Sequence, residues 1–242
     1  GRWGCRPVPE YAGKNLPNTL SKLKAGKPVK IVLYGDSIDG KGTLFDVRLR
    51  VLSCDGQVEA GQKDLVVSDA SETVLVLVAR SSHNGFDRSP SQAGRDASAD
   101  VAADLEALED ASCDTFLEKH IEDHESLQGR VTIDLGQSAD DIPTDRRVQG
   151  YGGVTDPGLA ALIFQYGRYL MIAGSRCGTQ AMNLQGIWNE EVIPPWCGAY
   201  TVNINTEMNY WPAEVTNLSE CQEPFFDLIA DCAKNGAVTA RQ

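Results

Sequence analysis

The sequence predicts a mixed fold, with β-structure in the first part of the chain and helices in the rest. Apolar residues alternate or form short runs between positions 43 and 82, which is typical of strands. From Ser91 to Gln128 they recur three and four positions apart, as along one face of a helix. The pair Asp156-Pro157 is a helix start and precedes about five turns of the same spacing. We therefore expect a fold class of mixed β and α.

Five short stretches are predicted to be strands. The run Val74–Val78 has no polar face, so we expect a central strand that is covered on both sides. Cys54-Asp55-Gly56 is a turn signal that ends the second strand. The predicted strands are Val29–Tyr34, Leu44–Val51, Asp64–Ser68, Thr73–Ala79 and Val131–Leu135.

The predicted helices have clear starts or stops. Asp156 caps a helix that has Pro157 at its first position and Gly174 as a plausible stop. A final helix is expected from about Glu220 to Ala233, with its apolar residues on one face. The other expected helices are a short basic piece at 16–25 and one or two acidic helices within 91–128.

Charge and hydropathy exclude two kinds of partner. The chain has 34 acidic and 22 basic residues and a net charge of −12, so we expect no nucleic acid. Its apolar runs are too short to span a membrane. No signal peptide is visible, which predicts a cytoplasmic protein if Gly1 is the true start. The sequence leaves the oligomeric state open.

No cofactor or metal is predicted. The seven cysteines include no CxxC pair, so we expect free, mostly buried thiols in a reducing compartment. His120 and His124 lie four positions apart, but HIEDH is not the zinc-binding HExxH pattern and a third ligand has no candidate. We interpret both as histidines on the surface of a helix.

The segment from Gln185 to Glu220 has the composition of a sugar pocket. It holds three of the four tryptophans, Trp188, Trp196 and Trp211, among several asparagines and glutamates. Aromatic rings stack on the C–H faces of a sugar, while amides and carboxylates bind its hydroxyl groups. We expect one or two of these tryptophans to line the pocket and the rest to pack the protein.

A serine turn follows the first predicted strand. With its lead-in, LPNTLSKLKAGKPVKIVLYGDSI, the turn resembles the opening block of the SGNH (GDSL-type) hydrolases, over residues 14–39. That resemblance implies Ser37 as an esterase nucleophile. The family takes its base from an Asp-x-x-His pair, and none of the three histidines has an aspartate three positions before it. A strand followed by a simple turn is the alternative.

From Gly42 onward the chain resembles glycoside hydrolase family 95, the inverting α-1,2-L-fucosidases. The matching blocks are LFDVRLRVLSCDGQVEA, TVLVLVARSS, PTDRR and the long segment that ends LQGIWNEEVIPPWCGAYTVNINTEMNYWPAEVTNLSE. The resemblance implies part of a β-sandwich, a helical linker and the first helices of an (α/α)6-barrel catalytic domain. The expected divisions are 1–40 (SGNH-like), 41–90 (β-sandwich), 91–135 (linker) and 136–242 (incomplete barrel).

The same resemblance implies that Asn203 and Asn205 are catalytic residues that orient the attacking water. A carboxamide can aim a water molecule but is too weak a base to deprotonate it, so a carboxylate must assist. The family's acid, a Glu, and its supporting Asp are implied downstream and match no residue here. Thr201 would point to the same side as both asparagines if the segment is extended.

Further residues complete the predicted site. Thr201, Trp188, Trp196, Trp211 and Glu214 are expected to bind substrate, although a packing or capping role is an alternative for Glu214. A structural alternative for the two asparagines is a turn held by side-chain bonds to the backbone. Asn217-Leu218-Ser219 also fits a glycosylation sequon.

We therefore predict an α-L-fucosidase-type glycoside hydrolase that removes terminal α-1,2-linked L-fucose from an oligosaccharide or glycan. The chain as given is expected to be inactive, because the acid is missing and the barrel is incomplete. The alternatives are a carbohydrate esterase that uses Ser37 and a carbohydrate-binding fragment without catalysis. L-galactosides differ from L-fucosides by one hydroxyl group, and the sequence does not separate the two.

Overall fold

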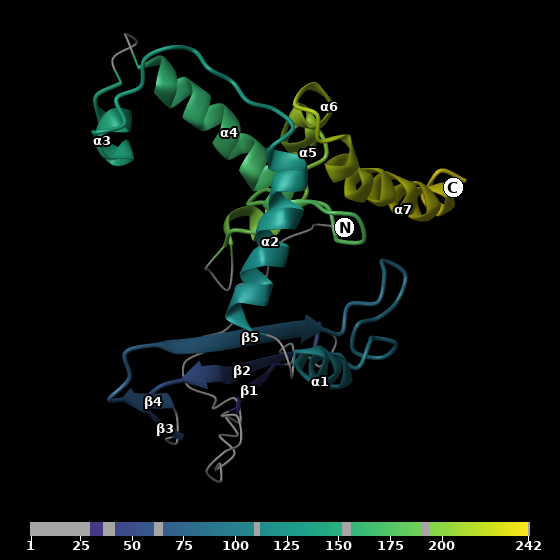
Figure 1. Ribbon diagram of the computed structural model, residues 1–242. Coiled ribbons are helices and arrows are strands. Elements are labelled where there is room, and N and C mark those ends of the chain that lie inside the picture. Colours follow the sequence, from purple (N-terminus) through teal and green to yellow (C-terminus); the bar gives the residue numbers. More distant parts are fainter. Residues whose placement is uncertain are drawn as a thin grey trace. The chain divides into compact units, whose positions relative to one another are not determined.

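The computed structural model describes residues 30–35, 42–60, 65–108, 112–151, 156–189 and 194–241 (Figure 1). These residues form strands in the first part and helices in the second, so the predicted mixed β and α fold is confirmed. The chain divides into two compact units, Gly1–Leu117 and Glu118–Gln242. This division lies inside the segment expected to be a linker, and the finer four-part organisation stays a prediction.

Unit 1 contains an antiparallel sheet and a hairpin. The sheet has the order β1 (Lys30–Gly35), β2 (Phe45–Cys54), β5 (Thr73–Ser81), and both of its pairings are antiparallel. The hairpin joins β3 (Gln57–Ala60) to β4 (Leu65–Ser68). Four of the five predicted strands are thereby confirmed, and β3 is a strand that the sequence analysis missed.

The strand β5 differs from its prediction. It lies at an edge of the described sheet and pairs only with β2 there, so the prediction of a central strand is wrong. The sheet's two faces explain the difference. On one face Val76 and Val78 are half-buried, whereas on the other Leu77 is 65% exposed. The apolar face that carries Leu77 is therefore uncovered among the described residues.

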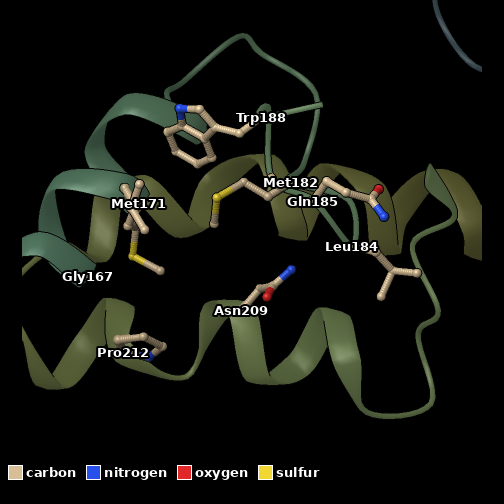
Figure 2. A pocket seen from close by; sticks show the side chains of 10 residues that line it. Gly167, Met171, Met182, Leu184, Gln185, Trp188, Asn209 and Pro212 are labelled. Atoms are coloured by element: carbon tan, nitrogen blue, oxygen red, sulfur yellow. The ribbon is translucent and has the colours of Figure 1, made fainter. Parts of the chain in front are cut away.

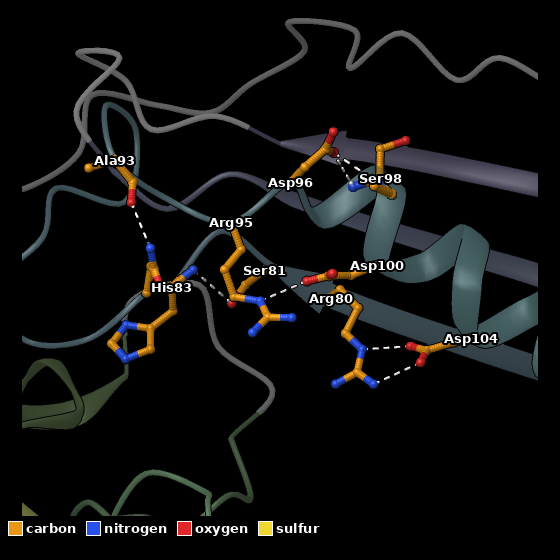
Figure 3. A network of polar contacts seen from close by, with 11 residues as sticks. Arg80, Ser81, His83, Ala93, Arg95, Asp96, Ser98, Asp100 and Asp104 are labelled. Carbon is orange, nitrogen blue, oxygen red and sulfur yellow. Dashed lines mark hydrogen bonds and ion pairs between the residues drawn. The ribbon is translucent and has the colours of Figure 1, made fainter.

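A short helix packs against this sheet through polar contacts. In α1 (Ala97–Ala107), Asp96 caps the N-terminus by accepting the backbone N–H groups of Ser98 and Ala99. Arg48 of β2 donates to Ser98 Oγ at 2.6 Å and to the buried carboxylate of Asp46 at 2.6 Å. Figure 3 shows two further ion pairs, which are Arg80 with Asp104 and Arg95 with Asp100.

Unit 2 is helical. The helix that Asp156 and Pro157 predicted is present as α4, and it ends at Gly174 as expected. The last helix starts three residues later than predicted and runs six further. The elements are α2 (Cys113–Gln128, which begins in unit 1), α3 (Thr144–Gln149), α4 (Pro157–Gly174), η1 (Pro195–Gly198), α5 (Asn205–Tyr210), α6 (Pro212–Val215), η2 (Ser219–Gln222) and α7 (Glu223–Thr239).

The predicted strand Val131–Leu135 is wrong, since these residues form no strand. Side chains of α4 instead donate hydrogen bonds to a backbone carbonyl group of this segment. The carbonyl oxygen of Val131 accepts hydrogen bonds from Gln165 Nε2 at 2.8 Å and from Arg168 Nη1 at 3.3 Å. Arg168 is buried and also binds the carbonyl oxygens of Leu127, Gln128 and Thr216. Arg168 thus donates hydrogen bonds to backbone carbonyl groups at the C-terminal ends of α2 and α6. These carbonyl groups have no N–H donor within their own helices.

The core of unit 2 is centred on Tyr210. Its ring stacks on Phe225 of α7, with 4.9 Å between the ring centroids. Its hydroxyl group accepts from the backbone N–H of Met182 at 2.9 Å and lies 2.8 Å from Ser175 Oγ. Ser175 donates in turn to the carbonyl oxygen of Cys221. This buried chain of hydrogen bonds connects α5 to the loop after α4 and to η2.

The cysteines differ from the prediction of free, mostly buried thiols. Cys197 is disulfide-bonded, so the thiols are not all free. Of the free thiols at Cys54, Cys113, Cys177, Cys221 and Cys232, only that of Cys221 is buried. No helix among the described residues is long and apolar enough to cross a membrane.

Candidate active site

The loop before α5 has an unusual backbone. Trp196 and Cys197 have φ values of 56° and 57°, and Gly198 follows with 59°. Thr201 also lies in the left-handed region, with a φ of 53°. Non-glycine residues adopt this conformation only when surrounding contacts impose it, and such positions concentrate at functional sites. One such contact is Gln185 Nε2, which donates to the carbonyl oxygen of Pro195 at 3.0 Å.

The two asparagines of the NIN motif lie at the N-terminal end of α5. Asn203 is in a turn and Asn205 is the first residue of the helix. Both are exposed, and neither carboxamide makes a hydrogen bond within the described part of the chain. The segment is not extended, so the condition under which Thr201 would point to the same side as both asparagines is not met.

A neighbouring threonine holds this turn in place. Thr206 is fully buried, and its hydroxyl group donates to the carbonyl oxygen of Tyr200. Its backbone N–H donates to the carbonyl oxygen of Thr201 at 3.4 Å. The fold therefore does not use the amides of Asn203 and Asn205 to stabilise the turn. Both amides remain available to bind a water molecule or a ligand.

A pocket of about 280 Å³ lies beside α5 (Figure 2). The indole of Trp188 forms one wall and lies close to Gly174 and Gly186, where a Cβ atom would come within 3.5 Å of the ring. Met171 and Met182 form apolar surface next to it. The pocket is lined by Gly167, Leu170, Met171, Met182, Leu184, Gln185, Gly186, Trp188, Asn209 and Pro212.

The polar part of the pocket consists of amides. Asn209 Nδ2 donates to the carbonyl oxygen of Asn183 at 3.0 Å, and Asn183 Oδ1 accepts the backbone N–H of Gln185 at 2.8 Å. Gln185 Oε1 is buried and accepts no hydrogen bond from the described residues. An indole wall in the same pocket as these amides suits a ligand with an apolar face and hydroxyl groups.

The structure brings only part of the predicted site together. Of the predicted residues, Trp188 lines the pocket, whereas the indoles of Trp196 and Trp211 are 82% and 62% exposed and lie outside it. Glu214 of α6 is also exposed and does not line the pocket. Ser37 lies outside the described residues.

Sequence reasoning missed two pocket residues, Asn209 and Gln185. A signal for Asn209 was present, because it follows Asn205 by four positions and α5 is helical. Residues four apart lie on the same face of a helix. Gln185 gave no such signal, since its position depends on the loop that joins it to Pro195.

Comparison with known proteins identifies the class of protein. Residues 112–242 match the Glycosyl hydrolase family 95 catalytic domain. The match covers more than half of the chain and contains α2 to α7, the pocket and both asparagines of the NIN motif. The chain therefore belongs to glycosyl hydrolase family 95, as the blocks in its sequence predicted.

The relatives that match this chain are named as fucosidases. The chain is 37% identical over 248 residues to "Alpha-L-fucosidase 2" of Arabidopsis thaliana, in an alignment that covers 99% of this chain and 28% of the relative. It is 29% identical to "Probable alpha-fucosidase A" of Aspergillus niger, over 87% of this chain and 28% of that protein. The protein of the same name from Aspergillus oryzae is 37% identical over 50% of this chain and 18% of its own length. The chain thus spans little more than a quarter of the first two relatives.

The plant alignment includes most of the first 40 residues, where the sequence also resembles an esterase. In the structure, β1 pairs antiparallel with β2, so the strand before the serine turn shares a sheet with the segment that resembles a glycosidase. The open sheets that present ligands at a strand's carboxyl end are mostly parallel. The esterase alternative stays a prediction that these observations do not favour.

Proposed function

We propose that this chain forms part of an α-L-fucosidase-type glycoside hydrolase that removes terminal α-1,2-linked L-fucose from an oligosaccharide or glycan with inversion. The observation that carries the proposal is the 37% identity to the plant α-L-fucosidase over 99% of this chain. Membership of glycosyl hydrolase family 95 and the free amides at the start of α5 support it.

The proposal assigns residues 41–90 to part of a β-sandwich, residues 91–135 to a helical linker and residues 136–242 to an incomplete (α/α)6 barrel. Apolar surface on the helices supports this assignment. On α4, Ile163 and Tyr166 are more than half exposed, and Phe226 is exposed on α7. Neighbouring helices in a barrel would cover such side chains, and their burial would stabilise the domain.

In the proposed mechanism Asn203 and Asn205 hold the attacking water. A carboxamide oxygen accepts a hydrogen bond from the water and so points a lone pair of the water oxygen at the anomeric carbon. Because the amide cannot take the proton at neutral pH, a carboxylate must accept it as the C–O bond forms. A carboxylic acid on the opposite side of the sugar then protonates the leaving oxygen.

The two carboxylates of this mechanism are not assigned to residues of the 242-residue chain. The family resemblance implies a Glu as the acid and an Asp as the supporting base. Glu214 is exposed on α6 and stays a proposed substrate contact. In this proposal the chain supplies the residues that position the water. The two carboxylates that transfer protons are not assigned to any of its 242 residues.

The sugar contacts are proposed in two groups. Trp188, with Asn209 and Gln185 beside it, offers a stacking face and amide groups in one pocket. Thr201, Trp196 and Trp211 are proposed as contacts made outside this pocket, since Thr201 and Trp196 lie in the strained loop before α5 and Trp211 follows α5 directly.

A chimera tests this function. The chain would replace the matched 28% of the plant α-L-fucosidase, and the product would be incubated with 2′-fucosyllactose. We expect release of L-fucose, with the β-anomer appearing first in the proton NMR spectrum because hydrolysis inverts the α-linkage. The isolated 242-residue chain, which lacks a residue matched to the acid, is the control and should release none.

Three outcomes would contradict the proposal. Initial formation of the α-anomer would exclude inversion. A folded chimera that hydrolyses an α-L-galactoside but no α-L-fucoside would change the substrate. A folded chimera without any glycosidase activity would show that this chain does not supply the water-positioning residues.

A further inference from the structure

One exposed turn of unit 2 carries an acceptor sequence for N-linked glycosylation. Asn217-Leu218-Ser219 fits the pattern Asn-x-Ser/Thr in which x is not proline. It is the only such triplet in the 242 residues. Any N-linked glycan on this chain would therefore be attached to Asn217.

The turn presents both functional side chains to solvent. Asn217 follows α6, has a φ of 58° and donates its backbone N–H to the carbonyl oxygen of Glu214 at 3.2 Å. Ser219 is the first residue of η2. Both residues are exposed, and neither side chain forms a hydrogen bond within the described part of the chain. Asparagine tolerates this left-handed conformation better than most residues.

The residue between them anchors the turn. Leu218 is completely buried in the core, and its backbone N–H donates to the carbonyl oxygen of Ala213 at 2.8 Å. With Leu218 fixed inside, its two exposed neighbours remain on the surface. A glycan on the carboxamide of Asn217 would extend into solvent and displace no core side chain.

A second, independent observation concerns the compartment. Cys197 is disulfide-bonded, and disulfides form and persist in oxidising compartments such as the lumen of the endoplasmic reticulum. N-linked glycosylation is likewise typical of secreted proteins, at surface positions. The disulfide and the exposed sequon therefore point to the same cellular route.

The glycan would also leave the proposed active site open. Trp211 has helical torsion angles and joins α5 to α6, so Val215 lies ten positions after Asn205 along helical backbone. At 1.5 Å per residue this distance is roughly 15 Å. Asn217 lies beyond that end, away from the amides that we propose to position water.

We propose that Asn217 carries an N-linked glycan and that the protein is made in the secretory pathway. In the reaction, the side-chain nitrogen of Asn217 bonds to the anomeric carbon of an oligosaccharide linked to a lipid diphosphate. The bond between that carbon and the diphosphate oxygen breaks, the lipid diphosphate leaves, and the amide loses one proton.

Peptide mass spectrometry on the protein from its own cells tests the proposal. Cleavage after Glu214 and Glu220 gives the short peptide Val215–Glu220, which contains the whole sequon. Treatment with peptide-N-glycosidase should release the glycan and convert Asn217 to aspartate, with incorporation of ¹⁸O from labelled water. An unmodified Asn217 in the native protein would overturn the proposal.

Variants of the chain, translated behind an export signal with microsomes, assign the site. The wild type should show one glycosidase-sensitive band of higher mass, and Asn217→Gln and Ser219→Ala should abolish it. Ser219→Thr should retain it, because threonine completes the sequon equally well. Asn235→Gln is the matched control, since Asn235 is exposed on α7 outside any sequon. A wild-type chain without this band, or an Asn217→Gln chain that keeps it, would contradict the proposal.

Discussion

Asn205 and Asn209 lie one helical turn apart on α5, so the free amide at the start of the helix and the pocket-lining amide share a face. Asn209 is held by its bond to the carbonyl oxygen of Asn183, whereas Asn205 has no such partner among the described residues. The fold thus fixes one amide in the pocket wall and leaves the other available. This arrangement is what the proposed water-positioning role requires.

Trp188→Ala should weaken sugar binding if the pocket holds a sugar ring. The substitution removes the aromatic wall, and the loss should be about tenfold or more in affinity, which corresponds to about 1.4 kcal/mol. Calorimetric titration of the chain with L-fucose and with D-galactose would measure it. Phe226→Ala is the control, because Phe226 is exposed on α7 and neither lines the pocket nor is proposed as a sugar contact. Equal affinity in the wild type and Trp188→Ala would exclude the pocket as the sugar site.

Tyr210→Phe should destabilise unit 2 by about 1–3 kcal/mol. The ring and its stacking on Phe225 remain, but the buried N–H of Met182 loses its acceptor and Ser175 loses a partner. Urea denaturation followed by circular dichroism would show the loss as a lower midpoint. Tyr169→Phe should change little, since the Tyr169 hydroxyl group makes no hydrogen bond among the described residues. A Tyr210→Phe midpoint equal to that of the wild type would contradict the network.

The ion pair between Arg147 and Asp156 should make stability depend on acid pH. The Arg147 guanidinium, at 2.7 Å, holds the pKa of the Asp156 carboxyl below its usual value of 3.8. A carboxyl with a lowered folded pKa contributes stability above its unfolded pKa, and this contribution is lost as pH falls through the folded value. We therefore expect the loss below about pH 4.

Asp156→Asn isolates this effect, because asparagine caps the helix α4 as well as aspartate does. The wild type should be more stable than the variant near neutral pH, and the difference should shrink as the pH falls below about 4. Asp141→Asn, at an exposed position, should show no such trend. A constant difference between the wild type and Asp156→Asn across the pH range would mean that the carboxyl charge is not responsible.

The long helices α4 and α7 of unit 2 could be predicted because their signals are local, whereas the short helices α3, α5 and α6 were not predicted. Asp156, Pro157 and Gly174 mark the ends of α4 in the sequence itself, and the structure places the helix between the same residues. The predicted strand at 131–135 failed for the opposite reason. Arg168 and Gln165, more than thirty positions away, occupy the carbonyl oxygen of Val131, and no local pattern reports such a contact.

The candidate site could likewise be predicted only in part, because distant contacts shape it. The composition of the segment around Asn203 and Asn205 indicated a sugar-binding region, and the family match agrees with it. Which tryptophan faces a pocket depends on how distant loops pack. Trp188 packs beside Gly174 and Gly186, while Trp196 stands on a turn with left-handed torsion angles. Spacing in the sequence could not separate these two environments.

The central claim is that Asn203 and Asn205 position the hydrolytic water, and fucose release by the chimera with the plant enzyme tests it most directly. Asn203→Ala and Asn205→Ala should each lower kcat about 10²–10⁴-fold, the range expected when a group that assists proton transfer is lost. Asn235→Ala, on the surface of α7, should retain wild-type activity. Wild-type kcat in both of the first two variants, with the chimera folded and active, would contradict the account.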